Sequence, residues 1–168
     1  MSMTTATNTP GVIARLVPTA RQSWHLVLGG FAATGFYEIW ANWPTQLFAG
    51  FPLEPPALVK LLFQRQFGLS VPDVWAKALH YVTGFIFYPL GYWLTTRLVR
   101  LGHPADGWLW GVVTYFIALG LLAPLAGLPF LLIGDNLQLS LMSLIGHAIF
   151  GYVLAVVFQA LETTHPSG

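Results

Sequence analysis

The sequence lacks cysteine and has few charged residues. With no Cys among its 168 residues, the chain has no disulfides, thiolate metal sites, iron–sulfur clusters or covalently attached c-type haem, while a histidine-ligated cofactor stays open. Only 8% of the residues are charged and 55% are hydrophobic, whereas roughly a quarter of the residues of a soluble domain are charged. So few charges cannot cover a surface in water, and we therefore expect the surface to face lipid or protein.

The charge balance and the missing motifs exclude further classes of function. The net charge is +1, which argues against nucleic acid as a partner because that binding is largely electrostatic. The chain has no glycine-rich phosphate-binding loop. It also lacks a buried acid at the spacing that a nucleophile, a base and an orienting group would need. We therefore expect no catalytic residues.

Four apolar stretches predict membrane-spanning helices, each of which needs about 20 residues. They cover residues 24–43, 72–98, 108–123 and 137–161, and the third is followed by a segment that stays apolar up to residue 133. The sequence thus predicts an all-α integral membrane protein, a four-helix bundle within residues 21–162. We expect residues 1–20 to form a disordered or surface tail and residues 163–168 a short polar tail.

The connection between the first two stretches contains Pro52, Pro55 and Pro56. Residues 56–68 within it carry apolar side chains at helical spacing, with polar and basic side chains on the other face. This pattern is typical of an amphipathic helix in the plane of the membrane interface. It fits equally a helix that caps the bundle for a partner subunit.

The distribution of lysine and arginine predicts the orientation. With both termini in the cytoplasm, that side carries Arg15, Arg21, Arg97 and Arg100, and the opposite side carries Lys60, Arg65 and Lys77. We therefore expect a multi-pass protein of the bacterial inner membrane with its N-terminus and C-terminus in the cytoplasm.

Two short patterns recur in the same order along the chain. The segments 49–53 and 126–130 are Ala-Gly-Phe-Pro-Leu and Ala-Gly-Leu-Pro-Phe. Each is followed by a stretch with a histidine, a glycine four residues later and then an aromatic residue, first at His80 and Gly84 and again at His147 and Gly151. A duplicated helical hairpin explains both repeats, and so does chance recurrence in an apolar sequence.

The two histidines are the main candidates for a cofactor site. His80 and His147 on facing helices could ligate a b-type haem, while Gly84 and Gly151, one turn further along, leave room for the macrocycle. The alternative is that each histidine bonds a neighbouring helix while the glycines permit close packing.

Glu38 adds two further possibilities. With His80 and His147 it offers two imidazoles and a carboxylate, a set that can hold a divalent metal ion. The same ionisable groups could line a path for protons or a transported substrate.

These observations favour a non-catalytic inner-membrane subunit that packs in or against a larger bioenergetic complex, respiratory or photosynthetic. A b-type haem electron-transfer protein is the alternative, and a small transporter or channel the third. The expected partners are the lipid bilayer and other membrane subunits. The many aromatic side chains could also contact a quinone, a pigment or a lipid.

Overall fold

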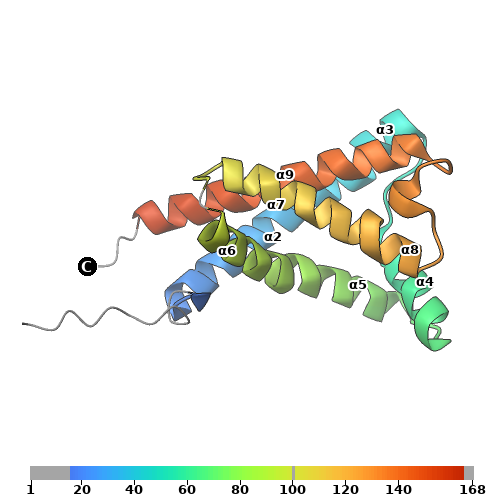
Figure 1. Cartoon of the computed structure of the whole chain (residues 1–168), viewed down its shortest axis with the longest axis horizontal. Coiled ribbons are helices and arrows are strands. Elements are labelled where there is room, and N and C mark those ends of the chain that lie inside the picture. Colours follow the sequence, from blue (N-terminus) through green and yellow to red (C-terminus); the bar gives the residue numbers. More distant parts are fainter. Residues whose placement is uncertain (1–15, 100, 165–168) are drawn as a thin grey trace, which may run out of the picture.

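A computed structural model describes residues 16–99 and 101–164, and within them every regular element is a helix. Two long helices are uninterrupted, α2 (Ala20–Asn42) and α9 (Leu137–Thr164). Two more are built from consecutive parts: the α5–α6 helix joins α5 (Asp73–Val82), η1 (Thr83–Phe87) and α6 (Tyr88–Leu98), and the α7–α8 helix joins α7 (Ala105–Tyr115), η2 (Phe116–Leu122) and α8 (Ala123–Leu125). Short helices α3 (Pro44–Ala49), α4 (Pro55–Phe67) and η3 (Phe130–Leu132) lie in the connections (Figure 1).

The all-helical prediction is confirmed, and the four long helices begin and end within a few residues of the predicted stretches. Two of them, Ala105–Leu125 and Leu137–Thr164, are long and apolar enough to cross a membrane by themselves. Helix α4 occupies the region where an amphipathic helix was expected. The predicted tails fall largely on residues 1–15 and 165–168, outside the described residues.

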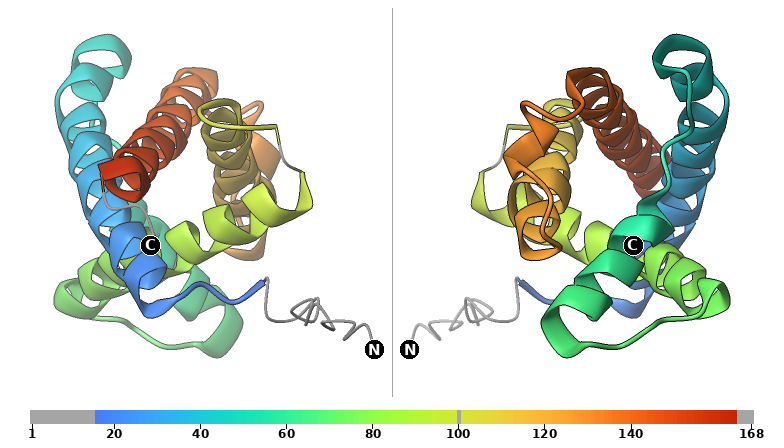
Figure 2. Two further views of the ribbon diagram at one scale, coloured as in Figure 1. Left: turned by 90° about the vertical axis from the view of Figure 1, so that its left-hand side faces the viewer. Right: turned by 90° about the vertical axis from the view of Figure 1, so that its right-hand side faces the viewer.

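The four long helices surround a common interior, as the end views in Figure 2 show. Helix α9 packs against both α2 and α7, α2 packs against η1 and α6, and α6 packs against α7. Glycines allow the closest approaches. A Cβ atom on Gly151 would clash with the backbone of Gly107 and Gly111, and one on Gly30 would clash with Pro89 and the backbone of Gly84.

Two of the long helices contain π-helical turns, and each turn precedes a proline. Segment η1 ends two residues before Pro89, and η2 ends two residues before Pro124. Proline has no N–H to donate, and its ring clashes with the carbonyl four residues earlier. A wider turn accommodates the proline without ending the helix. Turns of this kind occur often at functional sites.

The α5–α6 and α7–α8 helices meet where α6 packs on α7 and spread apart toward their other ends, forming a V (Figure 2). Helix α4 crosses the wide end of the V and contacts α5 and α8. Lys60 Nζ donates to Asp73 Oδ1 at 2.6 Å, and Gln66 Nε2 donates to the carbonyl of Leu125 at 2.5 Å. Helix α4 is thereby joined to both arms.

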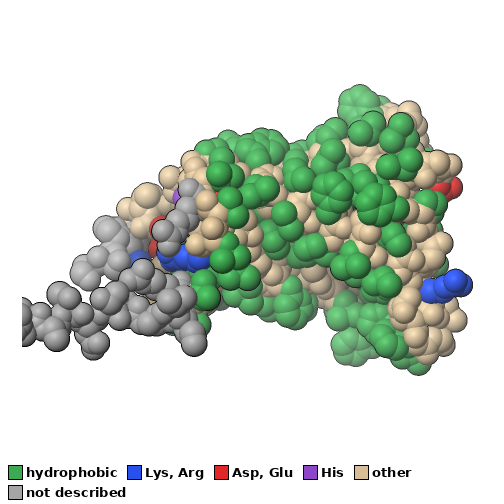
Figure 3. Space-filling view, in the orientation of Figure 1, with side chains coloured by type: hydrophobic (Ala, Val, Ile, Leu, Met, Phe, Trp, Pro, Cys, Tyr) green, Lys and Arg blue, Asp and Glu red, His purple; other side chains and the backbone are tan. Residues whose placement is uncertain are grey.

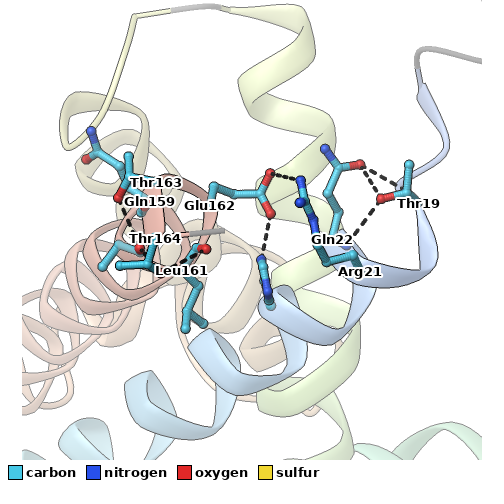
Figure 4. A network of polar contacts seen from close by, with 10 residues as sticks. Thr19, Arg21, Gln22, Gln159, Leu161, Glu162, Thr163 and Thr164 are labelled. Carbon is cyan, nitrogen blue, oxygen red and sulfur yellow. Dashed lines mark hydrogen bonds and ion pairs between the residues drawn. The ribbon is translucent and has the colours of Figure 1, made fainter. Parts of the chain in front are cut away.

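The narrow end is joined by polar contacts. Glu162, near the end of α9, accepts a 2.6 Å hydrogen bond from His25 Nδ1 and lies 3.7 Å from Arg21, both on α2 (Figure 4). Asp106, 3% exposed, accepts from the backbone amides of Leu101 and Gly102. The contacts of Glu162 hold α2 and α9 together, and those of Asp106 stabilise the turn before α7.

The surface between the two ends is apolar. Figure 3 shows hydrophobic side chains over the middle of the molecule and the charged side chains gathered toward its two ends. Large apolar side chains stand exposed on all four long helices, among them Phe31, Phe87, Phe116 and Leu141. Such a surface is far more extensive than the isolated apolar patches of soluble monomers.

Candidate functional site

A cavity of about 460 Å³ lies inside the wide part of the bundle. Its walls come from α2, from α5 and η1, from η2 and from α9, and its floor comes from α4 and the segment that leads into α4. Both π-helical turns border it, through Thr83 and Gly84 on one side and Ala118 and Leu119 on the other. The volume falls in the range of small-molecule sites, about 300–1,000 Å³.

One part of the cavity wall is polar. Its side chains are Thr34, Tyr37, His80, Tyr88, Ser143 and His147. Tyr37 connects several of them: its ring centroid lies 5.4 Å from that of His147 and 6.2 Å from that of His80, and its side chain interacts with Ser143.

The rest of the wall is apolar and almost without charge. Leucines from α4, η2 and the segment before α9 supply most of it: Leu58, Leu61, Leu119, Leu122, Leu128 and Leu132. Among the described residues, no lysine or arginine lines the cavity, and Glu54 is its one carboxylate. The cavity therefore suits an apolar molecule that carries a neutral polar group.

His80 is paired with Glu38 across the α2–α5 contact. The distance from His80 Nε2 to Glu38 Oε1 is 2.9 Å. Because an ionised carboxylate only accepts hydrogen bonds, Nε2 carries the proton and donates. The Glu38 side chain is 30% exposed and also accepts from Asn42. Glu38 thus lies behind the cavity wall and orients the His80 ring.

His147 faces the opposite helix, α7. Its Nδ1 lies 3.1 Å from Thr114 Oγ1, and that hydroxyl donates its own hydrogen to the carbonyl of Gly111 at 2.8 Å. Thr114 can therefore only accept from the imidazole, which places the His147 proton on Nδ1. Nε2 then carries a lone pair and has no hydrogen-bond partner among the described residues, while the ring lines the cavity.

Thr34 also carries a polar group without a partner within the described residues, as does Trp110 outside the cavity. Its side chain is 2% exposed, and its Oγ1 makes no hydrogen bond within the described part of the chain. The hydroxyl lies so close to Gly84 that a Cβ atom on Gly84 would displace it. Buried hydroxyls are nearly always paired, so this one, enclosed by the contact between α2 and η1, is an exception.

The structure gives Gly84 and Gly151 packing contacts. Gly84 receives the Thr34 side chain, and Gly151 lies against Gly107 and Gly111. Neither glycine opens a slot for a macrocycle, and the Tyr37 ring contacts both candidate haem ligands, His80 and His147. A haem in this cavity would also find no lysine or arginine for its two propionates among the described residues that line it.

The predicted metal set is brought together only in part. Glu38 and His80 are hydrogen-bonded, whereas His147 turns its Nδ1 to Thr114. Across residues 16–99 and 101–164, no three His, Asp or Glu side chains gather closely enough to hold a metal ion. The Glu38–His80 pair therefore stands as a carboxylate–imidazole contact within the protein.

The sequence interpretation missed Thr34, Tyr37, Tyr88 and Thr114. A signal for the first two exists, because Thr34 and Tyr37 are three residues apart and so share one face of the apolar middle of α2. Tyr88 and Thr114 have no comparable signal. Their place in the site depends on which helices are neighbours.

Comparisons with known proteins add no family. No protein-family model, no curated protein and no solved structure matches this chain. The features that indicate a function are therefore the cavity and the surface of the bundle.

Proposed function

We propose that this chain is an integral membrane protein of four spans: α2, the α5–α6 helix, the α7–α8 helix and α9. At about 1.5 Å per residue the 23 residues of α2 extend about 34 Å, enough to cross the hydrocarbon core. The exposed apolar side chains on all four helices support the proposal, as does the gathering of charges at the two ends.

The orientation remains the one expected from the sequence, with both termini in the cytoplasm of a bacterial cell and the protein in the inner membrane. The narrow end carries Arg21 and Arg97. The other two residues expected on the cytoplasmic side, Arg15 and Arg100, lie outside the described residues. The wide end carries Lys60, Arg65 and Lys77.

Single-cysteine labelling tests this topology, and the natural chain needs no prior cysteine removal. Ser70→Cys and Asp135→Cys should react with a membrane-impermeant maleimide in intact cells. Leu101→Cys should react only after the membrane is opened. Equal labelling at Ser70 and Leu101 in intact cells would contradict a four-span arrangement.

Within this framework we propose that the protein binds a small lipid-soluble molecule inside its bundle. The observation that carries the proposal is the 460 Å³ cavity with a polar wall and a leucine-rich remainder. A protein that holds such a molecule without a catalytic set suits the role of a non-catalytic subunit in or beside a bioenergetic membrane complex. We therefore also propose a larger membrane complex as the partner of this chain.

The test is to purify the protein in mild detergent, extract it with organic solvent and identify bound molecules by mass spectrometry. Ala118→Phe would place a ring into the cavity from η2, and Leu58→Phe would do so from α4. Both should reduce the amount of bound molecule. Ala160→Phe, on the exposed face of α9, is the matched control and should leave it unchanged.

An optical spectrum of the same preparation, oxidised and then reduced, examines the haem alternative. We expect no reduced α-band. If a band appears and is lost in His147→Ala, the bound molecule is haem and the proposed class of ligand is wrong. If extraction yields nothing above the level of the Ala118→Phe protein, the proposed binding function fails.

A further inference from the structure

We propose that the molecule held in the cavity is a membrane quinol, a neutral aromatic ring with hydroxyl groups and an apolar tail, whose hydroxyl donates to Nε2 of His147. This inference rests on the proposed ligand-binding function and names the ligand class. It concerns binding alone.

The charge of the wall excludes most lipid headgroups. No lysine or arginine lines the cavity within the described residues, and the one carboxylate, Glu54, lies with the floor segment. A phosphate or carboxylate headgroup would therefore be buried without a counter-charge, which is strongly unfavourable. A neutral headgroup has no such cost.

The hydrogen bonds of His147 leave its Nε2 as an acceptor that faces the cavity. Thr114 gives its hydrogen to the carbonyl of Gly111 and accepts from Nδ1 of His147, so Nε2 of His147 can only accept. The ring is 7% exposed and lines the cavity. A quinol hydroxyl satisfies this lone pair, whereas the carbonyl of an oxidised quinone presents another lone pair.

Aromatic side chains surround this part of the cavity. Tyr88 lies 5.8 Å from Phe150 and 6.4 Å from His147 between ring centroids, and all three line the wall. Edge and face contacts of this kind favour a flat aromatic ligand over a flexible chain. The leucines on the far wall suit the apolar tail.

The test measures binding of decylubiquinol, a benzoquinol with a ten-carbon tail, and of its oxidised form decylubiquinone. Both are titrated anaerobically into the detergent-purified full-length protein by calorimetry. We expect the quinol to bind about tenfold more tightly than the quinone, because a tenfold difference in Kd corresponds to the free energy of about one hydrogen bond. Equal binding, or tighter binding of the quinone, overturns the proposal.

Variants then identify the residues that are responsible for the preference for quinol over quinone. His147→Phe keeps a ring but removes the acceptor, so the preference for quinol should fall to near unity. Thr114 is a positioning residue, and Thr114→Val frees the imidazole to carry its proton on Nε2. In that variant the quinol should bind less tightly and the quinone more tightly. Thr95→Val is the control, because the Thr95 hydroxyl donates to Gly91 O away from the cavity.

Farnesol, an aliphatic isoprenoid alcohol, separates a quinol site from a site for any lipid alcohol. Binding as tight as that of decylubiquinol overturns the quinol assignment. If no probe binds while solvent extraction recovers another molecule, the quinol proposal falls and the binding function stands. If extraction recovers nothing and Ala118→Phe changes nothing, both fall.

Discussion

A threonine within a helix usually satisfies its hydroxyl by donating to a carbonyl of the preceding turn. Thr83 and Thr95 do so, to the carbonyls of Leu79 and Gly91 at 2.8 and 3.0 Å. Thr34 makes no such bond within the described residues, although it is the most deeply buried of the three. An unsatisfied buried hydroxyl costs about 1–3 kcal/mol. The Thr34 hydroxyl is therefore expected to lower the stability of the bundle.

Thr34→Val should therefore raise stability and leave binding unchanged. The protein should gain about 1 kcal/mol because the unpaired hydroxyl is removed at nearly constant volume. Decylubiquinol should bind as it binds the natural protein, because the hydroxyl is enclosed against Gly84. Thermal unfolding in detergent and calorimetry measure the two effects.

Thr45→Val provides the matched comparison. Thr45 is fully buried and donates to the carbonyl of Trp40 at 3.0 Å, so this variant should lose about 1 kcal/mol and bind the quinol normally. A Thr34→Val protein destabilised as much as Thr45→Val would show that the Thr34 hydroxyl is paired within the protein after all.

The contact between α7 and α9 depends on residues without side chains. A Cβ atom on Gly151 would meet backbone atoms of Gly107 and Gly111, which cannot move aside as a side chain does. Gly151→Ala should therefore separate the two helices and cost about 1–3 kcal/mol.

Gly35→Ala tests the same substitution where space is open. No atom lies within 4 Å of the position that an alanine methyl group would take on this face of α2, and alanine favours a helix over glycine by about 0.5–1 kcal/mol. The Gly35 variant should be as stable as the natural protein or more so. Similar thermal unfolding of the Gly151 and Gly35 variants would argue against close packing at Gly151.

The helices were predictable from the sequence and the cavity was not. Each long helix follows from an apolar stretch, a property local to the chain. The cavity depends on the divergence of the α5–α6 and α7–α8 helices and on two π-helical turns. Each turn precedes a proline, Pro89 or Pro124, but no local pattern in the sequence says that η1 and η2 border the same cavity.

The candidate site was likewise predictable from the sequence only in part. His80 and His147 stood out as ionisable residues in apolar stretches, and both line the cavity. Their partners, Glu38 at a separation of 42 residues and Thr114 at 33, are set by helix neighbours. The proton position on His147 depends on that second contact, so the acceptor role of its Nε2 could not have been derived from the sequence.

The whole molecule has a closed end and an open end. At the narrow end α9 is fastened to α2 through Glu162, His25 and Arg21, and α6 packs directly on α7. At the wide end the α5–α6 and α7–α8 helices part, and α4 spans the gap through side-chain contacts from Lys60 and Gln66. Stability and ligand binding should therefore respond to substitutions at different ends.

Glu162→Gln tests this separation. The variant weakens a charge-assisted contact with His25 and removes the attraction to Arg21, so the free energy of unfolding should fall by about 1 kcal/mol. The cavity lies at the opposite end of the bundle, and effects at separate sites are usually additive. Decylubiquinol should accordingly bind Glu162→Gln as it binds the natural protein, whereas Ala118→Phe should lose binding and keep its stability. Loss of binding in Glu162→Gln would mean that the narrow end controls how far the V opens, and the two ends would then have to be treated as one coupled unit.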